Sequence, residues 1–291
     1  MSGQPRRSTA ALLSVIVAAG CARGEGAWES ADVIAHPHGD AVVFEVTTVG
    51  GEPPRDRFFT DVPSLTVYGS GRLIAAAPQP ALFPPPTLPT LVERRLSEEG
   101  VQQLLRAGEA MGLLGDDVDY GRPTVGDGVT TVVTVHAAGR IRTYEVPGLG
   151  GSAGEAGLTA QQERVRRRLR DFLAALATAV TTVVGPEEVS AAKPFKPEAF
   201  AIRTEVVAQE SSAVASSELS PQVVPWPLDD VDPGTASDCQ VVRGSPAERL
   251  AEAVGGTTML TRFRRDELSY SLEVRPLLPS EEGCEAVTPP H

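Results

Sequence analysis

The segment that ends at Cys21 constrains this chain most, because it decides the compartment in which the rest folds. Arg6 and Arg7 precede an uncharged, mostly apolar run over residues 10–20. That run is too short to span a bilayer as a mature helix but suits the core of a secretory signal peptide. It ends in Val17-Ala18-Ala19-Gly20-Cys21, and small residues before a cysteine are what a bacterial lipoprotein signal peptidase requires. We therefore expect residues 1–20 to be a cleaved lipoprotein signal peptide.

Alternatives for this segment are an ordinary secretory signal with an incidental cysteine and an uncleaved membrane anchor. The pair Arg6-Arg7 also suggests twin-arginine export, but the residues after it favour the general secretory route. Under the lipoprotein reading Cys21 becomes the acylated first residue, and acyl chains such as palmitate contribute about 0.8 kcal/mol per buried methylene to membrane binding. The predicted localisation is the extracytoplasmic face of the cell membrane, with the membrane itself as a partner. Residues 21–40 would form a tether, in which Trp28 contacts either the interface or the folded domain.

Two further cysteines, Cys239 and Cys284, then remain. Exported chains in an oxidising compartment tend to pair their thiols, so the sequence predicts a disulfide between them. A metal-binding or catalytic thiol is the alternative, but apart from His291 at the end of the sequence no histidine lies near either cysteine along the chain.

Charge and composition argue against a nucleic-acid-binding protein and against a disordered chain. The chain has 26 Lys+Arg against 38 Asp+Glu, a formal net charge of −12, which disfavours nucleic acid as a partner because phosphate backbones require a positive field. An apolar share of 41% argues against wholesale disorder. The 28 glycines and 25 prolines predict many turns and ordered loops.

Hydrophobic periodicity predicts strands alternating with helices in the first half of the chain. A strand is expected over residues 41–49, hairpins over 64–76 and 129–146, and an extended proline-rich connection over 78–89. A helix should begin after Ser97 and end at Gly112. A second helix should begin at the capping box Thr159–Gln162, carry an apolar stripe as far as Val180, and close at Gly185-Pro186.

The second half repeats the order of helix and hairpin without repeating the residues. A strand is expected over residues 201–207, a proline-rich acidic loop around Trp226 over 221–233, a helix from a capping box at Ser245, and a hairpin over 257–274. We therefore predict an α+β fold of two modules, each a helix packed on an antiparallel sheet. Residues 41–185 form the first module, residues 186–200 a linker, and residues 201–291 a second module that contains the disulfide.

Most candidate catalytic or metal-binding patterns lack the context that their chemistry needs. Residues 150–154 match G-x-S-x-G, but prolines and glycines surround them where a hydrolase elbow needs a strand and a helix. His36 and His38 with Asp40 offer no apparent fourth metal ligand, so both are interpreted as exposed tether histidines. His136 is expected to face solvent, without a catalytic partner.

Two acidic clusters resemble calcium loops only superficially, since neither has a bidentate glutamate at the required position. They are Asp116, Asp117 and Asp119, and Asp229, Asp230 and Asp232. Weak calcium binding stays open for both, but solvated turn residues are the simpler interpretation. No cofactor, metal ligand or catalytic residue is predicted.

One concentrated positive patch stands out in an acidic chain. It consists of Arg164, Arg166, Arg167, Arg168 and Arg170 on the predicted second helix. For a tethered domain the patch could contact anionic lipid headgroups. The alternative is a solvated helix face that pairs with nearby carboxylates.

The chain resembles a family of lipoproteins from actinomycetes, the high-GC Gram-positive bacteria. The likeness is carried by the residues before Cys21, the hairpin Tyr68-Gly69-Ser70-Gly71-Arg72-Leu73-Ile74, and the segment Arg275-Pro276-Leu277-Leu278-Pro279 before Cys284. It implies localisation and brings no site residues with it.

The sequence thus predicts a lipid-anchored binding or scaffolding protein of the cell envelope, not an enzyme, whose partner is an envelope protein or a small ligand. A carrier of a lipid or small solute in a cleft between the modules is the alternative. An envelope hydrolase that uses unidentified carboxylates is a further one.

Overall fold

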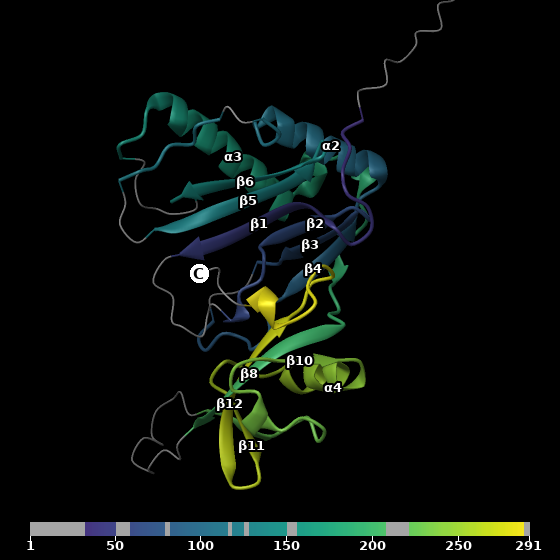
Figure 1. The fold of residues 1–291 in the computed structure, drawn as a ribbon, viewed down its shortest axis with the longest axis vertical. Helices are drawn as coiled ribbons and strands as arrows, with labels where there is room; N and C mark the ends of the chain where they lie inside the picture. Colours follow the sequence, from purple (N-terminus) through teal and green to yellow (C-terminus); the bar gives the residue numbers. More distant parts are fainter. Residues whose placement is uncertain are drawn as a thin grey trace, which may run out of the picture. The chain divides into compact units, whose positions relative to one another are not determined.

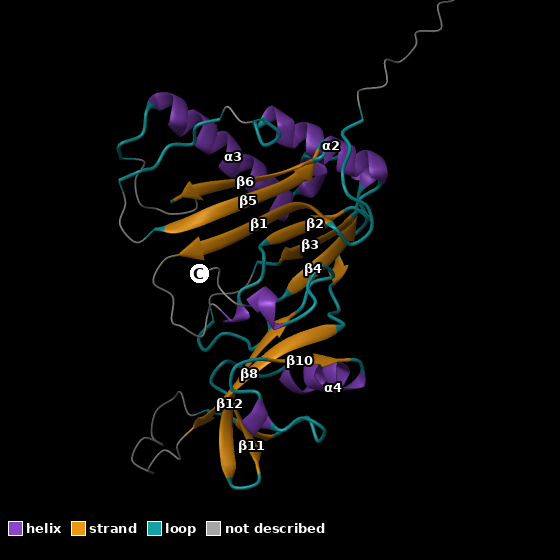
Figure 2. Ribbon diagram, in the orientation of Figure 1, coloured by secondary structure: helices purple, strands orange, loops and turns teal. Residues whose placement is uncertain are grey.

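The computed structural model describes residues 33–50, 59–78, 82–115, 118–124, 128–149, 156–207 and 221–287. These residues form two β-sheets and three α-helices (Figures 1 and 2), which confirms the mixed α+β class. The predicted signal peptide, Cys21, Trp28 and residues 150–154 lie outside the described residues. Among the described residues, no helix is long and apolar enough to cross a membrane.

The first sheet has seven strands in the order β6-β5-β1-β2-β3-β4-β7, and each strand is antiparallel to its neighbours. The strands are β1 (Val42–Gly50), β2 (Leu65–Tyr68), β3 (Arg72–Ala76), β4 (Leu91–Arg95), β5 (Val129–Ala137), β6 (Arg140–Pro147) and β7 (Lys193–Pro194). Both predicted hairpins are confirmed. Ala138 and Gly139 join β5 to β6 with φ of 51° and 69°, the left-handed pair that a tight two-residue hairpin turn requires.

Two helices, α2 (Glu98–Ala110) and α3 (Ala160–Thr178), pack on the first sheet. The side chain of Ser97 caps α2, and Thr159 and Gln162 form the predicted capping box of α3. Alternate strand residues such as Val133 and Val135 point to one face, where they join Leu104 of α2 in one buried core. Phe172 of α3 meets Phe44 of β1 edge to face, with ring centroids 6.1 Å apart.

The second sheet has five strands in the order β10-β8-β12-β11-β9. They are β8 (Ala199–Val207), β9 (Val223–Pro225), β10 (Gln240–Arg243), β11 (Arg262–Arg265) and β12 (Leu268–Pro276), and the helix α4 (Ser245–Val254) packs against them. The core of this sheet includes Phe200, Leu250 and Phe263. Trp226 is also buried there, and its indole N–H donates to the carbonyl of Val231 at 2.9 Å. It therefore fixes the proline-rich loop to the core.

Several elements differ from the sequence prediction. Strand β4 was not predicted, and β9 lies within the predicted loop 221–233, where it pairs in parallel with β11. Helix α3 ends at Thr178, and a separate 3-10 turn, η1 (Val180–Thr182), follows it. The predicted capping box at Ser245 is wrong: Gly244 is the N-cap, with φ of 61° and no side-chain cap bond.

The predicted linker over residues 186–200 is largely built into the fold. It contains the 3-10 turn η2 (Pro186–Glu188) and strand β7, and β7 pairs with β4 at the edge of the first sheet. The backbone N–H of Ser97 also donates to the carbonyl of Glu188 at 2.9 Å. These contacts tie the segment to the first sheet and to the start of α2.

The last part of the predicted tether is likewise attached to the domain. The backbone of Ile34 makes two hydrogen bonds with the side chain of Gln102 in α2, of 2.9 and 3.0 Å. A side chain at Gly69 would place Cβ only 2.1 Å from the carbonyl oxygen of Pro37, so the hairpin β2–β3 needs glycine there. Any free tether therefore ends before residue 34.

Residues near the start of β4 and the end of β12 join the two sheets. Thr87 donates its backbone N–H to the carbonyl of Thr257 at 3.0 Å, and the two hydroxyls are hydrogen-bonded at 2.8 Å. Leu278 is buried with Tyr68, Ile74 and Leu91 of the first sheet. Residues Ile34–His291 form one unit, and the division into two modules stays a prediction.

Candidate functional site

A spacious concave site lies in a groove beside strand β6, with a volume of about 680 Å³. One wall is the edge of β6, and the other is the loop between α2 and β5, closed at one end by the first turn of α3. The groove is lined by Val118, Asp119, Tyr120, Gly121, Arg122, Thr143, Tyr144, Glu145 and Gln162. Its volume lies in the range of 300–1,000 Å³ that is typical of ligand sites.

Asp119 holds the loop wall to α3. Its carboxylate accepts the backbone N–H of Gly121 at 2.8 Å and the side-chain amide N–H of Gln162 at 2.8 Å. These two hydrogen bonds lower the pKa of Asp119 below its usual value. Gly121 has φ of +64°, and a Cβ there would lie 2.7 Å from the Gln162 side chain. Glycine is therefore needed for the loop to approach the helix.

Arg166 links the loop wall of the groove to strand β6 from the buried side. It is only 1% exposed, and its guanidinium donates to the carbonyl of Tyr120 at 3.3 Å and to the carbonyl of Pro147 at 2.7 Å. Tyr120 belongs to the loop and Pro147 ends β6. A buried guanidinium that is hydrogen-bonded to both segments fixes the spacing between them.

Two tyrosines form the floor between loop and strand. The rings of Tyr120 and Tyr144 meet edge to face, with centroids 6.1 Å apart. The hydroxyl of Tyr120 donates to the carbonyl of Met111 at 3.2 Å, and that of Tyr144 donates to the carbonyl of Gly112 at 3.3 Å. Burial raises the pKa of Tyr120 to about 12, so this phenol stays neutral at physiological pH.

The predicted arginine patch is not a single surface. Arg166 belongs to the buried side of α3 and cannot contact headgroups, so this part of the prediction is wrong. Arg164, Arg167 and Arg168 are exposed and Arg170 is half-buried, and their contact with anionic lipid stays a prediction. The helical spacing could have identified Arg166 as the buried arginine of the patch, because it precedes Leu169 by three residues and so lies on the apolar stripe of the helix.

One histidine of the predicted tether is placed differently, whereas His38 is exposed as expected. The His36 side chain is 1% exposed, and its Nε2 lies 2.9 Å from a carboxylate oxygen of Glu98. Its Nδ1 is hydrogen-bonded to the carbonyl of Pro37 at 2.7 Å, so both ring nitrogens are engaged. The bond to His36 lowers the pKa of Glu98. His36 therefore attaches residues 34–40 to α2 and is not an exposed tether residue.

The other predicted residues do not assemble into a site. Asp230 is paired with Arg249 at 2.7 Å, and Asp232 accepts the backbone N–H of Gly234 at 3.0 Å to cap a short 3-10 turn, η3 (Pro233–Thr235). Asp116 and Asp117 lie outside the described residues. His136 is half-buried, and burial lowers its pKa. Among the described residues no cluster of three or more histidine, cysteine or acidic side chains could hold a metal ion.

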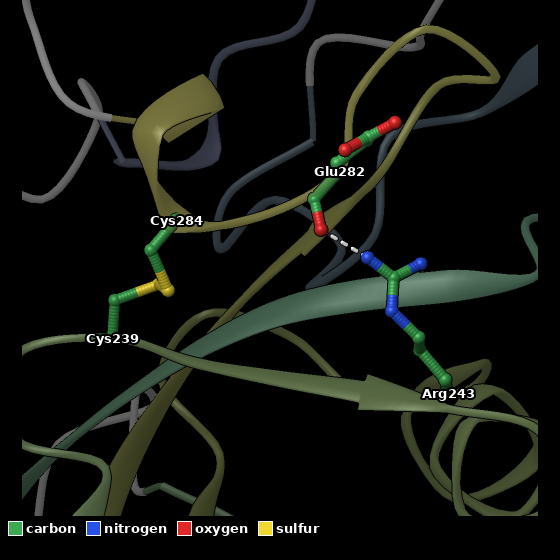
Figure 3. Close-up of a disulfide and its surroundings, with 4 residues drawn as sticks. All are labelled: Cys239, Arg243, Glu282 and Cys284. Atoms are coloured by element: carbon green, nitrogen blue, oxygen red, sulfur yellow. Dashed lines mark hydrogen bonds between the residues drawn. A yellow bond between two sulfur atoms is a disulfide. The ribbon is translucent and has the colours of Figure 1, made fainter.

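Cys239 and Cys284 are joined as a disulfide in the structure, with Cα atoms 6.0 Å apart (Figure 3). Cys284 begins the last described turn, η4 (Cys284–Val287). Figure 3 also shows that Arg243 of β10 donates to the backbone carbonyl of Glu282. Both contacts fix the C-terminal segment to the second sheet.

A buried ion pair between Arg275 of β12 and Glu281 also fixes this segment to the second sheet, and sequence reasoning did not identify it. Arg275 is 3% exposed and donates to both carboxylate oxygens of Glu281, at 2.8 and 2.6 Å. Its Nε donates to the carbonyl of Asp61 at 2.7 Å. The segment Arg275–Pro279, on which part of the resemblance above rests, thus lies at the junction of the sheets and has a structural role.

Glu45 lies close to this ion pair, on the face of β1 opposite to the helices. Burial raises the pKa of Glu45, and the neighbouring charge of Glu281 raises it further. A pocket of about 150 Å³ lies next to Glu281 and is bordered by charged groups of both signs, including Arg72 and Lys196. This pocket is small for an organic ligand, so we place the candidate site in the groove beside β6.

Comparisons with protein-family models, curated proteins and solved structures find no match to this chain. The resemblance to actinomycete lipoproteins therefore stays a prediction, and the functional argument rests on the residues and their geometry.

Proposed function

We propose that the protein is a lipid-anchored binding module on the extracytoplasmic face of a bacterial cell membrane. The anchor is supported by the small residues that lead into Cys21 after an apolar run. The disulfide geometry of Cys239 and Cys284 is consistent with an oxidising compartment.

The observation that carries the binding role is the groove beside β6. Arg166 holds its two walls at a fixed spacing through hydrogen bonds of 3.3 and 2.7 Å, and Asp119 fixes the loop wall to α3 through its 2.8 Å bond from Gln162. A preformed site loses little conformational freedom when a ligand enters it. The groove is also larger and more open than the pocket at the junction of the sheets, which has charged walls and a volume of about 150 Å³. This contrast favours a binding module over a carrier of lipid between the sheets.

The anchor is tested with Cys21→Ala, expressed from the full-length gene in a bacterial host and followed by detergent phase partitioning. We expect the wild type to enter the detergent phase and Cys21→Ala to leave it. The control Ser14→Ala changes the same apolar run but keeps Cys21. Equal partitioning of wild type and Cys21→Ala would refute the lipid anchor.

The binding role is tested in intact cells with a photo-crosslinking amino acid in place of Thr143, on the strand wall of the groove. We expect a discrete adduct from this position. The control position is the exposed Arg264 of β11, in the second sheet, from which we expect none. Adducts that are absent from Thr143, or equal at both positions, would refute the assignment of binding to the groove.

A further inference from the structure

An exposed apolar tip lies where the proline-rich connection meets the segment that follows α4. The tip consists of Leu82, Phe83, Pro86 and Met259. Leu82 is 62% exposed and Phe83 is 74% exposed, and among the described residues Phe83 is the only aromatic side chain that is exposed. Apolar residues that are exposed singly are common on protein surfaces, whereas a cluster of them indicates a contact surface. We therefore ask what the tip contacts.

Backbone hydrogen bonds hold the base of the tip in place. Pro86 and Thr258 form an antiparallel bridge, and the backbone N–H of Met259 donates to the carbonyl of Pro85 at 3.0 Å. The adjacent pair of buried threonines described above adds a backbone bond and a bond between hydroxyls. Each of the three prolines at 84–86 also restricts its own φ to about −65°. These contacts bring Met259 beside the proline run and give the exposed apolar side chains an ordered support.

The two segments that build the tip carry no charge. Residues 82–92 and 253–261 contain no Asp, Glu, Lys or Arg, although 22% of the chain is charged and its formal net charge is −12. The first charged residue after the first segment is Glu93, which is largely buried and paired with Arg72. The first charged residue after the second segment is Arg262, a cation. These segments therefore offer an acidic protein a surface that anionic lipid headgroups do not repel.

We propose that this tip contacts the bilayer and inserts Leu82 and Phe83 at the boundary between headgroups and acyl chains. The inference rests on the proposed lipid anchor, which keeps the bilayer within reach of the folded residues. Phenylalanine and leucine are side chains that peripheral proteins bury at this depth. The acyl chains attach the protein to the membrane, and the tip determines which face of the protein meets it.

The length of the tether leaves the choice of face to the protein surface. Cys21 lies twelve residues before Val33, where the described chain begins, and twelve residues span at most about 40 Å. A folded unit as long as Ile34–His291 has a radius of gyration of about 18 Å. The tether therefore permits several faces to approach the bilayer. An exposed apolar tip favours one of them, because removing apolar area from water is favourable.

Fluorescence quenching tests the proposal on the lipidated protein, expressed from the full-length gene and reconstituted into vesicles of phosphatidylcholine and phosphatidylglycerol. Leu82→Cys carries a polarity-sensitive fluorophore at the tip. Ile141→Cys carries it at the control position, a similarly exposed apolar residue of β6 (69%). The vesicles include lipids with a nitroxide on the acyl chain, which quenches fluorophores that enter the bilayer. We expect the label at position 82 to shift its emission to the blue and to be quenched, and the label at position 141 to do neither.

A second substitution in the labelled Leu82→Cys protein separates insertion of the tip from insertion of the fluorophore alone. Phe83→Ser should abolish most of the quenching, because a polar residue replaces the ring that inserts beside the label. The control Leu268→Ser changes an exposed apolar residue of the second sheet and should leave the quenching unchanged. Equal quenching with and without Phe83 would show that the fluorophore enters the bilayer by itself, and would overturn the proposal.

Three other results would also overturn the proposal. The first is a label at position 82 that is not quenched, or that is quenched no more than the label at position 141. The second is quenching at Arg167→Cys in place of Leu82→Cys, which would assign the membrane-facing surface to the exposed arginines of α3. The third is a label at position 82 that is shielded only when other envelope proteins are present, which would assign the tip to a protein partner.

Failure of this test is distinguishable from failure of the lipid anchor. With Cys21 acylated and Cys239 bonded to Cys284, an introduced cysteine is the only free thiol, so the protein without it should take up no fluorophore. Absence of the protein from the membrane fraction would refute the anchor. A vesicle-bound protein whose label at position 82 is not quenched would leave the anchor in place and reject only the contact of the tip with the bilayer.

Discussion

Replacing Arg166 with leucine should destabilise the protein far more than the same change at Arg167, the next residue along α3. Arg166 is buried and donates hydrogen bonds to the carbonyls of Tyr120 and Pro147, whereas Arg167 is exposed. The two substitutions remove the same charge from neighbouring positions of one helix. Their difference therefore isolates the contribution of the buried contacts.

The magnitude follows from the two hydrogen bonds. Each bond from a charged donor contributes about 1.5–3 kcal/mol, which gives about 3–6 kcal/mol for the pair. Leucine does not carry the cost of burying a guanidinium, and this offsets part of the loss. We expect a net decrease of about 2–4 kcal/mol in the free energy of unfolding. Arg167→Leu should stay within about 0.5 kcal/mol of the wild type, as exposed substitutions usually do.

Urea denaturation followed by circular dichroism measures this difference, and thermal unfolding provides a second estimate. A loss of 1 kcal/mol lowers Tm by about 2–4 °C in a chain of this size class. Hydrogen exchange adds a local measurement, since residues 118–122 should exchange faster in Arg166→Leu. Equal stability of the two variants would show that Arg166 does not hold the groove walls together, and the account of a preformed site would fail.

Two further predictions concern the junction of the sheets. Changing both Cys239 and Cys284 to alanine opens a loop closed by residues 45 apart. The free energy of unfolding, measured by urea denaturation without reductant, should then fall by about 4 kcal/mol on the chain-entropy model. A stability equal to that of the wild type would show that the bond does not form. Glu45→Gln should stabilise the protein at neutral pH, because burial raises the pKa of Glu45 above its usual value in the folded state. Ionisation then costs more there than in the unfolded chain. The gain should disappear as the pH falls below about 4, where the carboxyl is protonated in both states, and a gain that is the same at both pH values would contradict this reasoning.

The sequence allowed the regular elements to be predicted where local signals were strong. Ser97 and the capping box at Thr159 placed the starts of α2 and α3 correctly, because a side-chain cap is a local interaction between residues three apart. The start of α4 was assigned to the wrong residue, since Gly244 with its positive φ begins the helix without a side-chain cap. That backbone conformation leaves little trace in the residue pattern.

The candidate site depended on contacts that are distant in sequence. Arg166 reaches Tyr120 across 46 positions, and Gln162 reaches Asp119 across 43. Periodicity describes the faces of one element, and it does not show which loop will pack on them. For the same reason Arg275 and His36 were not assigned their roles, since their partners come from other parts of the chain.

The most direct test of the account is the intact mass of the protein recovered from the membranes of a bacterial host, together with the mass of its N-terminal peptide. We expect a mature chain that begins at Cys21 and carries a diacylglyceryl modification, with a further acyl chain where the host adds one. A chain that retains residues 1–20, or one that begins elsewhere with an unmodified Cys21, would contradict the proposal that this is a lipid-anchored protein.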